Sequence, residues 1–265
     1  MREGSLCRPM VLNRVLRAET LKMKRTIALK MVVLAPLAVV LLTIFMASQA
    51  PFSTLRRNAA SDDWKALARV NFQFWGLLMM PLFVTLQTAL MAGLDHTDNQ
   101  WKALLARPVP RWTFYVSKLL IVMAMTAASA MLLVAGVVAA GGILHLLTSE
   151  VRFGGAVPLS SILLQAAQMT GLAFFYLSIQ TWVALRWRSF SAATGVGIVA
   201  TVTSFAMLLA AGQFGAWPQY YPWALPMLVL ARQPENVAAA LSISAALGML
   251  AAVAGCADFC RREVT

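Results

Sequence analysis

Long apolar stretches alternate with short polar segments along this chain, and six of the stretches are long enough to cross a lipid bilayer. A helix rises about 1.5 Å per residue, so a hydrocarbon core of about 30 Å takes about 20 apolar residues. The stretches comprise residues 27–48, 70–94, 119–147, 160–185, 190–211 and 237–257. Pro36 and Pro81 fall inside the first two, where they predict kinks. The pattern predicts an all-α integral membrane protein with six transmembrane helices.

Residues 12–27, before the first span, have the spacing of an amphipathic helix. Its apolar side chains share one stripe, and most of its basic side chains face the other way. We expect this helix to lie in the membrane interface, where its cations attract anionic lipid. Glu19 falls within the apolar stripe, which predicts either an ion pair with a cation of the main body or a carboxylate that snorkels to water. The charged positions considered are Glu19, Lys22, Lys24 and Arg25.

Basic residues are unevenly divided between the two sets of loops. Sixteen of the 22 Lys and Arg residues lie in the terminal segments and in the loops on their side. The positive-inside rule therefore predicts that both termini are cytoplasmic. The formal charge of +12 does not indicate a nucleic-acid partner, because the basic residues lie at the ends of apolar runs and do not interleave with exposed aromatic residues. We expect one transmembrane domain over 1–265: an interfacial helix in 1–26, the bundle in 27–257 and a cytoplasmic tail in 258–265.

The polar residues of the chain match none of the common catalytic motifs. There is no H-E-x-x-H, G-x-S-x-G or P-loop sequence, and the three cysteines give no disulfide or metal framework. No Asp or Glu lies in the interior of a predicted span, which disfavours an ion-coupled carrier. We predict no catalytic, metal or cofactor site in this chain, so energy for any work must come from another polypeptide.

A polar segment of more than twenty residues separates the second and third spans. Asp98 is a good N-cap for a two-turn helix over 99–106, which the prolines at 108 and 110 end. An inter-span turn with Trp101 anchored at the headgroups explains less of this length than a knob that docks a cytoplasmic partner. The predicted docking residues are Asp98, Gln100, Trp101, Lys102, Leu104, Leu105, Arg107 and Arg111.

Residues 212–232 are too broken by proline to span and too apolar for a free loop. Their aromatic residues form a belt typical of a membrane interface, and 225–231 is predicted to be a short helix that dips back into the outer leaflet. The segment is either a lid over a substrate path or an interfacial anchor. The aromatic residues considered are Trp217, Tyr220, Tyr221 and Trp223.

Two motifs resemble those of permease subunits of ABC-2-type exporters, especially the branch with lantibiotic-immunity and bacitracin-export permeases. One runs from Asp95 through Trp101-Lys102-Ala103-Leu104-Leu105 and Pro108-Val109-Pro110-Arg111 to Tyr115 and Lys118. The other is residues 18–26, AETLKMKRT, before the first span. The six spans and the re-entrant segment before the last one also fit this family.

The resemblance implies a permease in a bacterial plasma (inner) membrane that exports a hydrophobic or peptide-antibiotic-like substrate. Two permeases, identical or paired, would join two cytoplasmic ATPase subunits, which would hold ATP and Mg²⁺. The helix over 99–106 would then be the coupling helix seated on the ATPase. The alternative is a structural or sensory membrane protein whose polar loop docks another cytoplasmic partner.

Overall fold

The computed structural model describes residues 8–24, 26–49, 63–97, 109–147, 156–187, 189–210, 220–227, 230 and 234–261. Every element in these ranges is helical. The long helices are α1 (Arg8–Met23), α2 (Ile27–Gln49), α3 (Asp63–Phe74), α4 (Met80–Thr97), α6 (Arg111–Leu147), α7 (Leu159–Arg186), α8 (Phe190–Leu209) and α10 (Pro234–Arg261). A π-helical turn, η2 (Trp75–Met79), joins α3 to α4, and a 3₁₀ turn, η4 (Leu225–Met227), precedes α10.

Within the described residues, six helices are long and apolar enough to cross a membrane, which confirms the predicted number of spans. Two of them begin earlier than their apolar stretches indicate. The second starts at Asp63, and the third starts at Arg111. The added turns contain polar residues, but they also contribute buried side chains such as Leu67 and Tyr115. Packing on neighbouring helices, and not contact with lipid, explains why these turns are helical.

A π-helical turn lies directly before Pro81. There the Met80 N–H donates to the carbonyl of Trp75, five residues back. Proline lacks an N–H and crowds the carbonyl four residues earlier, so a wider turn relieves the α-helical pattern at this point. The other predicted kink position, Pro36, lies inside α2, which is assigned as one α-helix throughout.

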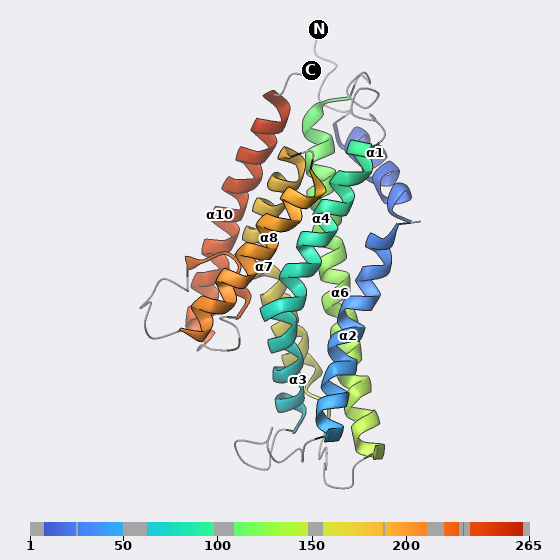
Figure 1. The fold of residues 1–265 in the computed structure, drawn as a ribbon, viewed down its shortest axis with the longest axis vertical. Helices are drawn as coiled ribbons and strands as arrows, with labels where there is room; N and C mark the ends of the chain where they lie inside the picture. Colours follow the sequence, from blue (N-terminus) through green and yellow to red (C-terminus); the bar gives the residue numbers. More distant parts are fainter. Residues whose placement is uncertain are drawn as a thin grey trace.

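Figure 1 shows α1 and the C-terminal end of α10 at the same end of the bundle, which we call the terminal end. At the other end, called the opposite end, α2, α3 and α6 extend further than α8 and α10 do (Figure 1). α7 packs against α10, α6, α4 and α8, so it is the central helix of the bundle. Large apolar side chains are exposed along α2, α8 and α10, as expected for helices that face lipid.

The helix before the first span differs from its prediction in bounds and in surroundings. It was expected over 12–27, but α1 ends at Met23 and Ile27 already belongs to α2. Its apolar residues Val15 and Met23 are buried, and α1 packs against α6. The apolar stripe of α1 therefore contacts protein, whereas lipid was expected.

Candidate functional site

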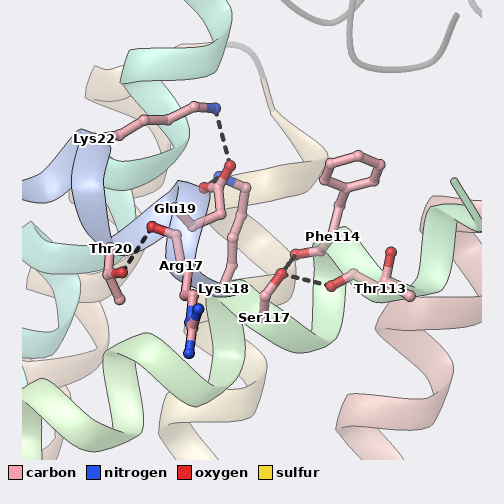
Figure 2. A network of polar contacts seen from close by, with 8 residues as sticks. All are labelled: Arg17, Glu19, Thr20, Lys22, Thr113, Phe114, Ser117 and Lys118. Carbon is pink, nitrogen blue, oxygen red and sulfur yellow. Dashed lines mark hydrogen bonds and ion pairs between the residues drawn. The ribbon is translucent and has the colours of Figure 1, made fainter. Parts of the chain in front are cut away.

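The most buried charges of the terminal end lie between α1 and the start of α6. Glu19 of α1 is 3% exposed and Lys118 of α6 is 1% exposed. Lys118 Nζ lies 2.7 Å from Glu19 Oε2, and Lys22 Nζ lies 2.9 Å from Glu19 Oε1. Figure 2 shows the Glu19 carboxylate reached by both amines, one from its own helix and one from α6. Glu19 thus pairs with a cation of the main body, which decides between the two readings of its position.

The two partners of Glu19 differ in their surroundings. Lys22 is about one third exposed and lies one turn away on the same helix, so its contribution is that of a screened local pair. Lys118 is buried and 99 residues distant in sequence. Removing one member of a buried pair costs about 3–5 kcal/mol, because a charge is left without compensation. The pair therefore fixes which turn of α1 faces which turn of α6.

The first turns of α6 position Lys118 through contacts with their own backbone. The main-chain N–H and the hydroxyl of Thr113 both donate to the carbonyl of Pro110. One turn later, the Ser117 hydroxyl donates to the carbonyl of Thr113 (Figure 2). The Thr113 N–H is one of the donors that a helix start leaves without an α-helical partner, and its bond to Pro110 satisfies it.

On another side of α6, the same turns contact the end of α10. Arg111 Nη1 donates to the main-chain carbonyl of Cys260 at 3.3 Å. This contact is favourable because the last carbonyls of a helix attract a nearby cation. Beside it, the ring centroids of Tyr115 and Phe259 lie 6.1 Å apart. We call Glu19, Lys118, Arg111 and the carbonyl of Cys260 the α6 clamp. It joins the start of α6 to both the first and the last helices of the chain.

A smaller polar contact joins α7 to α10 at the same end. Trp182 Nε1 donates to Asp258 Oδ2 at 3.1 Å, and Arg186 Nε lies 3.8 Å from the same oxygen. Both charged groups are substantially exposed, so water screens this pair more than it screens the pair of Glu19 and Lys118. Together with the α6 clamp, it gives the terminal end a layer of directional contacts.

The aromatic residues after α8 occupy three different environments. Tyr220 is 58% exposed, whereas Trp223 is 6% exposed and stacks on Tyr176 of α7 with ring centroids 5.8 Å apart. The Tyr221 hydroxyl donates to the carbonyl of Ala200, near the middle of α8, and burial raises the pKa of Tyr221. Tyr221 and Trp223 therefore pack against α8 and α7. Trp223 was expected in an interfacial belt and is instead buried on the ring of Tyr176.

The remaining predicted site residues are placed only in part. Arg111 and Lys22 take part in the contacts above, and Lys24 is exposed. The predicted short helix over 225–231 is described only as the 3₁₀ turn η4. The other predicted positions lie outside the described residues: Arg25, Asp98, Gln100, Trp101, Lys102, Leu104, Leu105, Arg107 and Trp217.

Sequence reasoning missed two residues of these polar contacts, Lys118 and Asp258. The motif that contains Lys118 did not identify it as the partner of Glu19, and no role was predicted for Asp258. A signal for the first existed in the sequence, since both Glu19 and Lys118 lie among apolar residues at the ends of helices. A charge in such a place needs a counter-charge nearby.

A family model described as "ABC-2 family transporter protein" matches residues 15–204, a range that includes Glu19, Arg111 and Lys118. A search of curated proteins finds no match.

Proposed function

The chain belongs to the ABC-2 family of transporter proteins, and on that premise we propose that it is the permease of an exporter driven by a separate ATPase subunit. The observation that carries the proposal is the α6 clamp. α6 follows directly after the polar segment 98–108, and its first turns are tied to α1 by a buried ion pair and to α10 by Arg111. A force applied to that segment would reach three helices at once.

The clamp suits the transmission of movement for a physical reason. Packed apolar side chains slide over one another at small cost, whereas an ion pair with short fixed distances resists relative shift of the two helices. We infer that an ATPase seated on 98–108 moves α6 together with α1 and the end of α10. The tilt of these helices then changes access to a path through the bundle.

Further parts of the proposal follow from the sequence. The terminal end is the cytoplasmic end, because most basic residues belong to it. Two copies of the permease, or two paired permeases, face two ATPase subunits in a bacterial inner membrane, and ATP and Mg²⁺ are held by the ATPases. The cargo is hydrophobic or resembles a peptide antibiotic, as in the lantibiotic and bacitracin branch of the family. Membership of a transporter family argues against the structural or sensory alternative.

The experiment concerns Trp101, the largest apolar residue of the segment. A buried aromatic anchor at an interface contributes about 2 kcal/mol or more, so Trp101→Ala is expected to weaken ATPase association about thirtyfold. The measurement is co-purification in detergent of the permease with a separate ATPase subunit, together with the abundance of the permease in membranes.

The matched control is Tyr220→Ala, which truncates an exposed aromatic residue at a distance from the α6 clamp. Its ATPase association is expected to equal that of the wild type. If Trp101→Ala keeps full association and full transport, the segment is a headgroup anchor and the proposed docking is wrong.

A further inference from the structure

A pocket of about 410 Å³ opens near the terminal end, between α4 and the junction of α7 with α8. Small side chains from three helices leave the space, among them Ala89 on α4, Ala184 on α7 and Ala193 on α8. Its volume falls within the range of about 300–1,000 Å³ that is usual for sites of small molecules. Apart from the Ser189 hydroxyl, which accepts the N–H of Ala192, and the indole N–H of Trp187, the side-chain groups of the lining are apolar.

Gly93 contributes to this space by having no side chain. A Cβ added at Gly93 meets no atom of another residue within 4 Å, whereas one added at Gly197 meets Thr85. Gly197 is needed for a close helix contact, and Gly93 is not. At the mouth, Trp187 is 48% exposed and Phe190 is similarly open, so an apolar molecule can enter from the side.

A buried polar side chain, that of Gln180, lies behind the wall of the pocket and is not one of its lining residues. Gln180 precedes the lining residue Ala184 by one helical turn, and its Nε2 donates to the carbonyl of Ala193, another lining residue. The Gln180 side chain is fully buried, and among the described residues its Oε1 receives no hydrogen bond. A buried acceptor of this kind favours a ligand that brings its own donor.

We propose that the pocket binds an apolar molecule that carries an N–H or O–H donor, and that this is the class of cargo. The apolar body fills the space between the alanines, and the donor is directed past Ala184 and Ala193 toward Gln180 Oε1. A plain lipid acyl chain has the same apolar chemistry but no donor, so it fits less well. The assignment as cargo rests on the proposed function, whereas binding itself does not.

The experiment uses the isolated chain in detergent micelles and two probes of similar shape. N-phenyl-1-naphthylamine has one N–H, and 1-phenylnaphthalene has none. Saturable binding is measured by energy transfer from tryptophan, with empty micelles as blank. One net hydrogen bond predicts that the wild type prefers the N–H probe about threefold to tenfold. Gln180→Met, which keeps the volume but removes the acceptor, is expected to bind the two probes equally.

Filling the pocket supplies the second variant. Gly93→Leu is expected to weaken binding of both probes at least about tenfold, because its side chain occupies the space. Gly195→Leu is the matched control, since a Cβ there also meets open space but lies outside the pocket. Gly195→Leu is expected to change the affinity for either probe by less than about twofold relative to the wild type. Equal thermal unfolding of the variants shows that they are folded.

Three outcomes overturn the proposal. The first is unchanged binding by Gly93→Leu, and the second is the same probe preference in Gln180→Met as in the wild type. The third concerns competition by lipid. If the same concentration of added phosphatidylglycerol displaces the N–H probe from the wild type and from Gln180→Met, the occupant is a lipid chain. Because these assays need no ATPase, a failure here leaves the docking of the ATPase untouched, and the converse also holds.

Discussion

The start of α6 and the ring cluster around Trp223 are both buried, but they are held together in different ways. At α6 the contacts join named polar atoms, with Lys118 Nζ 2.7 Å from Glu19 Oε2 and Arg111 on a main-chain carbonyl. Around Trp223 the contacts are between ring faces, as in its stack on Tyr176. The indole N–H of Trp223 and the hydroxyl of Tyr176 have no hydrogen-bond partner among the described residues.

This difference predicts which part of the bundle moves as a unit. Ion pairs and hydrogen bonds hold one distance and one direction, whereas ring packing tolerates small shifts with little change in energy. We therefore expect the α6 clamp to keep its geometry during transport. The helices are expected to rearrange at the ring cluster, where Trp223 and Tyr176 can slide without breaking a polar bond.

The largest expected effect comes from breaking the ion pair. Lys118→Met leaves the Glu19 carboxylate buried with Lys22 as its remaining ion-pair partner among the described residues, and this is expected to cost about 3–5 kcal/mol of stability. The measurement is the midpoint of thermal unfolding in detergent, together with abundance in membranes. Adding Glu19→Gln to the same chain is expected to recover most of the loss, because the buried charge is then removed.

The charge exchange Glu19→Lys with Lys118→Glu sharpens this test. It keeps a pair of opposite charges at the same place, although it puts two lysines side by side on α1. Transport is expected to be greater in the exchanged double variant than in either single variant. Single variants with wild-type stability and transport would show that the α6 clamp has no mechanical role.

A middle-sized effect is expected at the ring cluster. Trp223→Leu removes the stack on Tyr176 and leaves a void, at a cost of about 2 kcal/mol, which is less than full truncation because leucine fills part of the space. The neighbouring exposed Tyr220→Leu is the control and should change stability by less than about 0.5 kcal/mol. The same thermal midpoint serves as the measurement. Equal values for the two variants would contradict the buried placement of Trp223.

The smallest effect is expected at Tyr221. Tyr221→Phe removes only the hydroxyl that donates to the Ala200 carbonyl, and such bonds in membrane proteins contribute about 0.6–1 kcal/mol. A slightly lower thermal midpoint with unchanged transport is the expected result. A loss of transport at normal stability would instead show that the movement needs this bond. It would contradict the expectation that the helices rearrange at the ring cluster without depending on a polar bond.

Much of the fold could be predicted because hydropathy reports contact with lipid directly. The six spans follow from it, but the starts of the second and third helices do not. The turns that begin at Asp63 and Arg111 are polar on one side and packed on protein on the other. Hydropathy averaged over both sides of such a turn gives no apolar signal. These turns are helical because of packing on other helices, which the local sequence does not identify.

The site was less predictable than the fold, for reasons of distance and of choice. Glu19 is conspicuous in its apolar stripe, but the chain has 22 basic residues, and nothing local selects Lys118 among them. For Trp223 the difficulty is to predict the environment of the side chain. An aromatic residue beside prolines suits a headgroup layer and a buried stack equally well, and only the position of Tyr176 on another helix decides between them.

The distance of 99 residues between Glu19 and Lys118 has a consequence for how the protein is made. A ribosome adds about 5–20 residues each second, so Glu19 emerges roughly 5–20 seconds before its buried partner exists. During that time α1 has no α6 on which to pack. Lys22, one turn away, is the partner within reach. We therefore expect the local pair to hold the carboxylate while the chain is being made, and the docking of α1 to follow the synthesis of the third span.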